Sequence, residues 1–387
     1  MSHIHVCLVS EQTIPNILST DFFKPDELLF ITTVKMEALK KTDHILQALA
    51  HIGQGFNGRS QKVVVQEDSL LDCKRKLDDW ISGREGAEFT VNLTGGTKIM
   101  SIAVYEYFKD YGSRMIYIPV GKNGFLAPFP KRASKEFTQL PLRLSVSDYL
   151  AAYGLKVINQ KKLAANHSEA VQRQGLSEWI VRNYEQIKPL LERLSEKLRK
   201  YRDERKGYHL ETTYVPQNDK EQELFNRLGF LFKGSGYAKQ LSQSEIMYLT
   251  GGWLEEFCYN EIAQFKGKGI DDVVIGIIPE SHGRNNEFDV MFTKDNALYT
   301  VECKSLDQND DKRAEALYKI AALQKDFGLR IESFFVSTSP HILRDGQIKP
   351  SIAARAEQFK TTVIPPHDVV HFAQKVAERL NIGRGND

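Results

Sequence analysis

The sequence lacks several features that would assign it to a class directly. No apolar run reaches about 18 residues, so a membrane-spanning helix is not expected. The four cysteines, Cys7, Cys73, Cys258 and Cys303, include no C-x-x-C pair, which argues against a disulfide framework or a zinc knuckle and fits a reducing cytoplasm. An excess of one charge is also lacking, since 52 lysines and arginines face 50 aspartates and glutamates. The net charge of +2 therefore neither requires nor excludes a nucleic-acid partner.

The composition that remains is that of a globular protein. Hydrophobic residues make up 41% of the chain and charged residues 26%, which is enough apolar surface to exclude global disorder. At roughly 150 residues per domain, 387 residues predict two or three domains. The first residues contain no basic stretch followed by an apolar run, so we expect no signal peptide and a cytoplasmic protein.

Residues 1–130 alternate between two patterns. Nearly continuous apolar runs predict buried strands at 5–10, 28–33, 62–66, 89–94 and 115–120, and helical spacing predicts helices at 14–20, 36–52, 70–81 and 98–111. Buried strands joined by helices indicate a parallel sheet that is covered on both faces. We therefore predict an α/β fold with a Rossmann-like N-terminal domain and the strand order 3-2-1-4-5.

Two further regions follow. Residues 131–244 contain a short helix at 147–154 and a long amphipathic stretch at 176–206, which predict a helical connector, with a winged-helix-like fold as one option. Residues 245–387 predict a helix (245–265), three strands (272–278, 286–293, 297–305), a helix (312–327), a strand (331–337), a helix (351–359), a strand (362–364) and a last helix (367–380). That order indicates a second α/β domain with a mixed sheet, and the tail 383–387 is expected to be disordered.

The segment 286–305 is the most informative in the chain. Asp295 and Asn296 separate two alternating runs, which predicts a two-residue type I′ hairpin whose paired residues have numbers that sum to 591. One face of the ribbon then pairs Phe288 with Cys303, Val290 with Val301 and Phe292 with Tyr299, and is wholly apolar. The other face pairs Asp289 with Glu302, and Lys304 points the same way.

Opposed like charges on a sheet are destabilising, so folding alone would not select Asp289 opposite Glu302. A divalent cation between them reverses that argument, and hard oxygen ligands favour Mg²⁺ or Mn²⁺. Such a metal would lower the pKa of a bound water, and the Lys304 ammonium could hold that water or the transition-state oxygens of a phosphodiester. A surface hairpin with solvated charges is the plainer interpretation, because a D…E-x-K triplet is short and common.

With the acidic helix 251–262 before it, this segment resembles the PD-(D/E)XK, restriction-endonuclease-like nucleases. Their pattern is an acid on a leading helix, then an Asp, then Glu-x-Lys. The resemblance assigns Asp289, Glu302 and Lys304 to the catalytic set, with Asp289 and Glu302 as the metal ligands. The helix acid is Glu255 or Glu256; we prefer Glu255, which directly follows Trp253 and Leu254.

In the N-terminal domain, two unusual loops follow the strands that should be neighbours where the strand order reverses, and ligands bind at that point in such sheets. One is SEQTIPN (10–16) after the first strand, and the other is NLTGGTKIMS (92–101) after the fourth. Glycines allow close backbone approach, and the helix start and Lys98 favour an anion. The second loop lacks the Walker A spacing, so ATP hydrolysis is not indicated. A tight turn with a solvated lysine is the structural alternative.

These two loops resemble those of CARF domains, the sensors of cyclic oligoadenylate in type III CRISPR defence, and a CARF domain joined to a PD-(D/E)XK domain resembles the CRISPR-ancillary nucleases. The resemblance implies a homodimer that holds the ligand across its two-fold axis. It implies cyclic tetra-adenylate as activator, Mn²⁺ or Mg²⁺ as cofactor, and single-stranded DNA or RNA as substrate, with nicking of duplex DNA also known in the family. The implied ligand-binding residues are Ser10, Gln12, Pro15, Asn16, Thr94, Gly95, Gly96, Thr97 and Lys98.

Two rival functions remain at this stage. A non-enzymatic ligand-sensing regulator that binds DNA would need an eroded nuclease site, whereas Asp289, Glu302 and Lys304 are all present. A restriction or repair nuclease that needs no second messenger would give no reason for the two loops. The predicted domains are thus a CARF-like sensor (1–130), a helical connector (131–244) and a nuclease domain (245–387).

Overall fold

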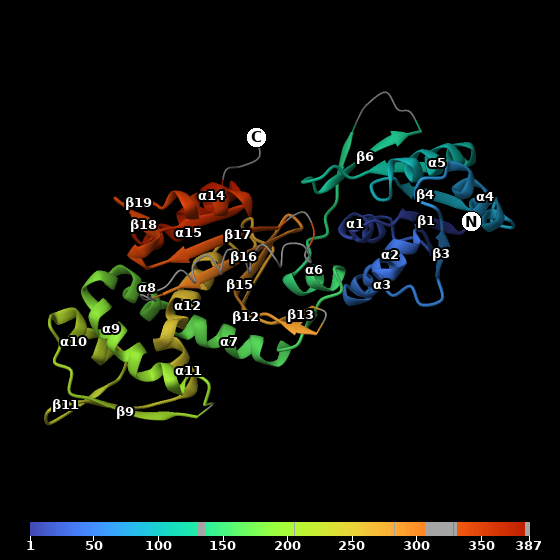
Figure 1. Cartoon of the computed structure of the whole chain (residues 1–387). Coiled ribbons are helices and arrows are strands. Elements are labelled where there is room, and N and C mark those ends of the chain that lie inside the picture. Colours follow the sequence, from blue (N-terminus) through green and yellow to red (C-terminus); the bar gives the residue numbers. More distant parts are fainter. Residues whose placement is uncertain (131–135, 205, 282, 306–327, 329–330, 384–387) are drawn as a thin grey trace.

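The computed structural model describes residues 1–130, 136–204, 206–281, 283–305, 328 and 331–383. Figure 1 shows an N-terminal lobe, coloured from blue to teal, and a larger lobe formed by the rest of the chain. Helix α6 (Val146–Ala152) and strand β13 (Pro279–Ser281) lie between the two lobes. The predicted helix at 312–327 and most of the tail 383–387 lie outside the described residues.

The N-terminal lobe is built on a seven-stranded sheet with the order β3-β2-β1-β4-β5-β6-β7. The first five strands are parallel and have the predicted order 3-2-1-4-5. Two antiparallel strands extend the sheet, and the second of them lies beyond residue 130, where we placed the end of this domain. The strands are β1 (His3–Leu8), β2 (Glu27–Thr32), β3 (Ser60–Val64), β4 (Glu88–Asn92), β5 (Arg114–Tyr117), β6 (Gly124–Phe129) and β7 (Phe137–Gln139).

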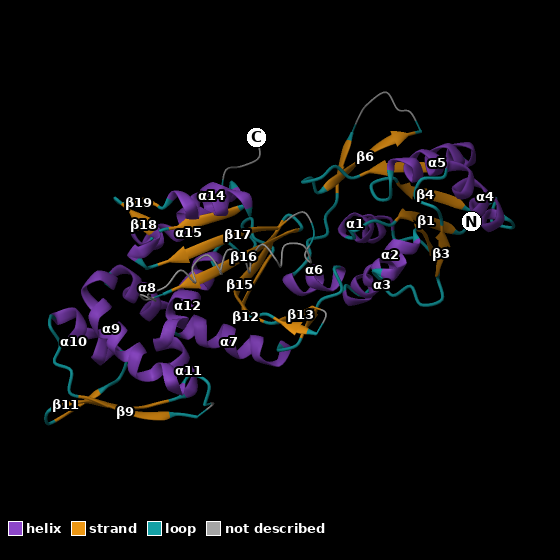
Figure 2. Cartoon of the chain, viewed as in Figure 1, coloured by secondary structure: helices purple, strands orange, loops and turns teal. Residues whose placement is uncertain are grey.

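Helices cover both faces of this sheet, as the continuous apolar runs predicted (Figure 2). Along β1, Val6 and Leu8 pack into the cluster beneath α4 (Leu70–Ile81) and α5 (Lys98–Phe108). Cys7 points the other way, into the cluster beneath α1 (Ile14–Phe23), α2 (Val34–Ala38) and α3 (Lys41–His51). Alternate side chains of one strand thus fill two cores, and both loops after β1 and β4 emerge at the same edge.

The connector contains a small β-sheet as well as the predicted helices. It contains α7 (Gln160–Gln172), α8 (Gln174–Arg182), α9 (Tyr184–Leu198), α10 (Asp219–Arg227) and α11 (Gln243–Met247). Between them lies a three-stranded antiparallel sheet of β9 (Tyr208–Thr212), β10 (Leu231–Lys233) and β11 (Gly236–Leu241). Our sequence analysis did not place these strands, which have only three to six residues each; Tyr237 and Leu241 of β11 are buried, whereas Leu231 and Phe232 of β10 are exposed.

The larger lobe contains a five-stranded mixed sheet with the order β12-β15-β16-β17-β20. Strands β12 (Asp272–Ile277), β15 (Phe288–Lys294) and β16 (Ala297–Lys304) are antiparallel neighbours, and β17 (Ile331–Ser337) and β20 (Thr361–Ile364) continue in parallel. Helices α12 (Trp253–Ala263), α14 (Pro350–Gln358) and α15 (Phe372–Leu380) complete the domain. Four two-residue strands, β8 (Lys156–Val157), β14 (Arg284–Asn285), β18 (Leu343–Arg344) and β19 (Gln347–Ile348), form small ribbons.

The helix predicted over 245–265 is divided. Helix α11 passes through a π-helical turn (Tyr248–Gly252) before α12 begins at Trp253. Gly251 has φ +141°, which L side chains rarely adopt, and a Cβ there would lie 2.9 Å from Ser305 Oγ. The kink therefore brings the start of α12 against the end of β16. None of the helices in the described residues is long and apolar enough to cross a membrane.

Candidate active site and ligand pocket

The β15–β16 hairpin has the predicted turn and register. Asp295 and Asn296 have φ of +51° and +56°, as a type I′ turn requires. The ladder runs from Lys294 opposite Ala297 to Val290 opposite Val301, in pairs whose numbers sum to 591. Beyond that last pair the Asp289 carboxylate accepts the backbone N–H of Cys303 at 2.6 Å.

Our prediction for the two faces of this hairpin was wrong in part. The Phe292 and Tyr299 rings stack 4.9 Å apart, on the predicted apolar face. Phe288, however, packs in the cluster of Met291 and Leu298 and not in that of Cys303. The second face is thus also apolar and buried, because the 140–155 segment covers it, and the carboxylates occupy only its end.

At that end the structure brings Asp289, Glu302 and Lys304 together. The Glu302 side chain is 5% exposed, and its Oε1 accepts a hydrogen bond from Lys304 Nζ at 2.8 Å. Burial, together with the negative charges of Glu255 and Glu302, raises the pKa of Asp289 well above its usual value. Burial alone would lower the pKa of Lys304, but the neighbouring carboxylates outweigh it and raise that pKa.

The cluster fits a divalent cation. In the described part of the chain no three His, Cys, Asp or Glu side chains are arranged to hold a metal by themselves. Mg²⁺ is nevertheless commonly held by one or two carboxylates, with waters and substrate phosphates as its other ligands. Asp289, which is half-buried, and Glu302, which is buried, supply two carboxylates whose mutual repulsion a cation would relieve. These are the residues that could hold Mg²⁺ or Mn²⁺.

Glu255 and Glu256 have different surroundings. Burial is the main cause that raises the pKa of Glu255 to about 7; Arg202 and Lys304 oppose the shift, and the negative charges of Glu287 and Glu302 add to it. Glu255 therefore lies in the electrostatic field of the hairpin carboxylates. Glu256 instead accepts a 3.0 Å hydrogen bond from Arg173 Nε and a second one from the same guanidinium. Of the two alternatives, the structure brings Glu255 to the cluster.

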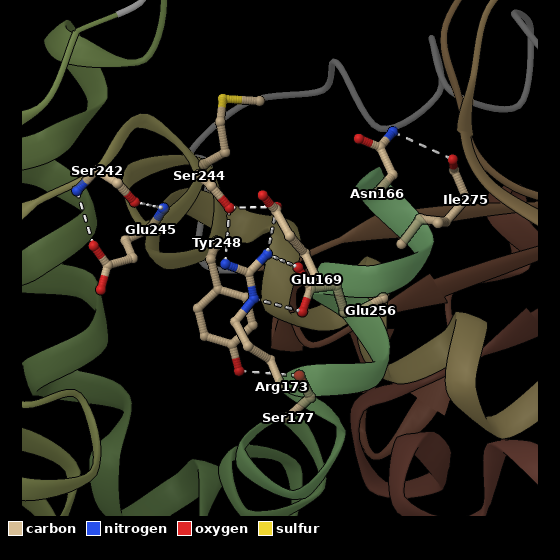
Figure 3. A network of polar contacts seen from close by, with 12 residues as sticks. Asn166, Glu169, Arg173, Ser177, Ser242, Ser244, Glu245, Tyr248, Glu256 and Ile275 are labelled. Atoms are coloured by element: carbon tan, nitrogen blue, oxygen red, sulfur yellow. Dashed lines mark hydrogen bonds and ion pairs between the residues drawn. The ribbon is translucent and has the colours of Figure 1, made fainter. Parts of the chain in front are cut away.

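Figure 3 shows the network that Glu256 joins. Arg173, at the end of α7, also pairs with Glu169, donates to Ser244 Oγ at 2.9 Å, and stacks its guanidinium 4.8 Å from the centre of the Tyr248 ring. One arginine thus fastens the connector to the π-helical turn and to α12. This network fixes the helix on which Glu255 stands.

In the N-terminal lobe, the two unusual loops are joined by buried Asn92. Its Nδ2 donates to Asn16 Oδ1 (2.9 Å) and Ser19 Oγ (3.1 Å), and its Oδ1 accepts from both the N–H and the hydroxyl of Thr94. Asn16 Nδ2 in turn donates to the carbonyl of Leu8 at 2.9 Å. These hydrogen bonds hold the loops after β1 and β4 side by side, as the predicted strand order requires.

A cavity of about 120 Å³ lies between these loops. Six of the nine predicted ligand-binding residues line it, namely Ser10, Gln12, Pro15, Asn16, Thr94 and Gly95. Gly95 is required by packing, because a Cβ at this position would lie 2.1 Å from the Leu8 carbonyl oxygen.

The other three predicted residues, Gly96, Thr97 and Lys98, do not line this cavity. Gly96 has a φ of +71° that suits glycine. The Thr97 hydroxyl caps α5 by accepting the N–H of Met100 and donates to the carbonyl of Glu67. Lys98 is exposed at the start of α5.

The remaining lining residues were missed by sequence analysis. They come from α1, from the β5–β6 loop, from α6 and the residue after it, and from the hairpin turn of the other lobe: Ile14, Leu18, Ile118, Pro119, Val120, Gly121, Lys122, Tyr149, Tyr153 and Asn296. No local signal marks them, since these segments meet only in the folded chain. The sole partial signal is that positions 118–122 follow the fifth strand at the edge where ligands bind.

Two family models match the chain. Residues 4–149 match the Card1 CARF domain, and residues 242–382 match the Card1-like endonuclease domain. No curated protein matches the sequence.

Solved structures share the fold over nearly the whole chain. Can2 from Sulfobacillus thermosulfidooxidans, solved in complex with cyclic tetra-adenylate, is 21% identical with a TM-score of 0.75, over 96% of this chain and 98% of that one. Protein VC1899 from Vibrio cholerae is 18% identical with a TM-score of 0.78, over 98% of each chain. A type III CRISPR defence DNA nuclease activated by cyclic oligoadenylate is 19% identical with a TM-score of 0.52, over 87% of this chain and 45% of that one. At these identities the likeness shows the fold.

Proposed function

Because the chain belongs to the proteins that join a Card1-type CARF domain to a Card1-like endonuclease domain, we propose that it is a metal-dependent endonuclease switched on by cyclic tetra-adenylate in type III CRISPR defence. Single-stranded DNA or RNA is the proposed substrate, with duplex DNA nicked as a further one. The endonuclease family supports nucleic-acid cleavage, and Can2, a protein of the same fold, was solved with cyclic tetra-adenylate.

The observation that carries this proposal is the cluster of buried Glu302 with half-buried Glu255 and Asp289, beside Lys304. A folded chain gains nothing from the Glu255 and Asp289 carboxylates, whose pKa is raised by burial and by the negative charges around them. A bound Mg²⁺ or Mn²⁺ would supply an activated water and neutralise charge on the phosphodiester. Asp289 and Glu302 would hold that ion. Lys304, hydrogen-bonded to Glu302, is placed to orient the attacking water or to stabilise the phosphorane oxygens.

The N-terminal pocket supports a ligand shared between two chains. Its volume of about 120 Å³ is below the roughly 300–1,000 Å³ of ordinary ligand pockets. One chain could therefore enclose only part of a ring of four nucleotides. A homodimer that places two such pockets across a two-fold axis would enclose a two-fold ring, and this favours cyclic tetra-adenylate.

The connector offers a path for the substrate strand. An open groove of about 780 Å³ runs along α9 and β9, and its lining combines four cations with two acids: Arg193, Lys197, Arg199 and Lys200, with Glu196 and Glu211, beside Tyr208 and Leu210. A groove in which cations outnumber acids attracts the phosphate backbone of a single strand. Arg202, at the end of this basic segment, acts on Glu255 electrostatically.

The test is a cleavage assay with Mn²⁺ on labelled single-stranded DNA, single-stranded RNA and supercoiled plasmid, with and without cyclic tetra-adenylate. We expect ligand-dependent cleavage that falls at least about 100-fold in Glu302→Gln and in Lys304→Ala. Calorimetry should show that both variants still bind the ligand. Equal cleavage with and without ligand would favour the messenger-independent nuclease, and absence of cleavage in every arm would favour the non-enzymatic regulator. Cleavage that survives both substitutions would remove the active-site assignment.

A further inference from the structure

One wall of the N-terminal pocket belongs to the nuclease domain. Asn296, in the turn of the β15–β16 hairpin, lines the pocket together with Ser10 and Thr94. The same hairpin carries Asp289 and Glu302 at its other end. A single supersecondary element therefore extends from the candidate ligand pocket to the candidate active site.

The Asn296 side chain is fully buried and bonded to the N-terminal part of the chain on both ends of its amide. Its Oδ1 accepts the backbone N–H of Leu144 at 2.9 Å. Its Nδ2 donates to the carbonyl of Leu142 at 3.0 Å and to Asn123 Oδ1 at 3.1 Å. A hairpin turn exposed to solvent would need none of these bonds, so the turn is docked at this position.

Asn123 bonds to both residues of the turn. While its Oδ1 accepts from Asn296, its Nδ2 donates to Asp295 Oδ1 at 2.9 Å. Asn123 follows directly after Gly121 and Lys122, which line the pocket in the β5–β6 loop. A shift of that loop when the pocket fills would therefore reach the hairpin turn through one side chain.

A second connection runs through the segment before α6. Thr293 Oγ1 donates to the carbonyl of Leu144 at 2.8 Å, which fixes the strand next to the turn. Helix α6 begins shortly afterwards, and its Tyr149 lines the pocket while packing in the cluster of Met291 and Leu298. The pocket and the buried face of the hairpin thus share one layer of side chains.

We infer that the Asp295–Asn296 turn, docked on Asn123, couples pocket occupancy to the placement of Asp289 and Glu302. This inference rests on the proposed function and names the element that would transmit activation. Five consecutive residue pairs join the two strands, so the hairpin moves as a unit. From Asn296 to Glu302 the strand spans about 20 Å, at roughly 3.3 Å per residue. A displacement of the turn therefore reaches the carboxylates without a change in the strands between.

Exchange of the asparagine and the aspartate between positions 123 and 295 tests the coupling. Asn123→Asp places a carboxylate against Asp295, so we expect stimulation by cyclic tetra-adenylate to fall about tenfold or more, within the usual range of allosteric coupling. Asp295→Asn added to that variant restores a donor opposite the new carboxylate, and we expect it to recover stimulation to within about threefold of the wild type. The measured quantity is the ratio of cleavage rates with saturating ligand and without ligand.

Asn57→Ala is the matched control, because Asn57 is an exposed asparagine of the same lobe outside the pocket, and its stimulation should equal that of the wild type. The inference fails if Asn123→Asp is stimulated like the wild type, if higher ligand concentration restores its stimulation, or if the double variant is no better than the single one. The wild-type arm separates the two claims: a wild type that the ligand does not stimulate removes the proposed function itself.

Discussion

The N-terminal pocket and the C-terminal carboxylate cluster both lie at the ends of buried strands, but their electrostatics are opposite. In the pocket, Asn16, Asn92 and Thr94 satisfy one another through neutral hydrogen bonds. In the cluster, Asp289 and Glu255 are acids whose burial and neighbours raise their pKa. The pocket is therefore complete without a ligand, whereas the cluster carries an unfavourable charge that a cation would compensate.

This contrast indicates what each site does for stability. Substitution in the pocket should cost stability, because it breaks satisfied hydrogen bonds or packing. Neutralising an acid of the cluster should stabilise the protein without metal while it removes activity. A substitution that raises stability while it removes activity is characteristic of a residue that is kept for function although it destabilises the fold.

The largest expected effect separates two adjacent glutamates. Glu255→Gln should lower cleavage at least about 100-fold without loss of stability, because it removes a group of the cluster and a buried charge. Glu256→Gln should instead leave Arg173 with a weaker partner and lower the free energy of unfolding by about 2 kcal/mol, less than the roughly 3–5 kcal/mol of a wholly buried pair because Glu169 remains. Cleavage rates and denaturant unfolding of both variants measure the difference.

Glu261→Gln, on the same helix and outside both clusters, is the control for the helix itself. If Glu256→Gln lost activity while keeping wild-type stability, and Glu255→Gln did the reverse, the assignment of the helix acid would have to be exchanged.

An intermediate effect concerns pH in the absence of metal. Since the pKa of Glu255 is raised from 4.5 to about 7 in the folded protein, the folded state keeps a proton that the unfolded state loses between these values. Stability should therefore fall as pH rises from about 4.5 to 7, by up to about 3 kcal/mol, and change no further above pH 7 from this group. Thermal unfolding in EDTA from pH 5 to 8 measures the slope, which should flatten in Glu255→Gln.

Added Mn²⁺ should reverse this trend, because the ion binds the ionised carboxylates and its stabilisation grows with pH. A wild-type slope identical to that of Glu255→Gln, with and without Mn²⁺, would show that Glu255 does not titrate in the cluster.

The separation in sequence between the residues that form each feature explains which features the sequence could predict. Asp289, Glu302 and Lys304 lie within one hairpin, so a local pattern and a two-residue turn sufficed to place them on one strand pair. The order of the five N-terminal strands followed from buried apolar runs. The hairpin depends on residues close in sequence, and the strand order on the Rossmann-like layout that buried strands joined by helices indicate.

What escaped prediction depends on long-range contacts. The second face of the hairpin, with Met291 and Leu298, is buried because α6 packs against it, and the hairpin's own sequence does not show which segment covers that face. The Asn296 side chain lines a pocket whose other walls lie more than 140 residues away in sequence. Glu255 and Glu256 could not be separated before the position of Arg173, on another helix, was known.

The smallest expected effect tests the edge of the pocket. Lys98 is exposed and outside the cavity, so Lys98→Ala should leave stability unchanged and weaken the binding of cyclic tetra-adenylate by about tenfold at most, through one charge-assisted phosphate contact. Gly95→Ala, three residues earlier, forces a Cβ against the Leu8 carbonyl and should lower stability by about 1–3 kcal/mol. Calorimetric titration and thermal unfolding measure both. Unchanged affinity in Lys98→Ala at low salt would place the ligand phosphates away from the start of α5 and restrict the site to the neutral pocket.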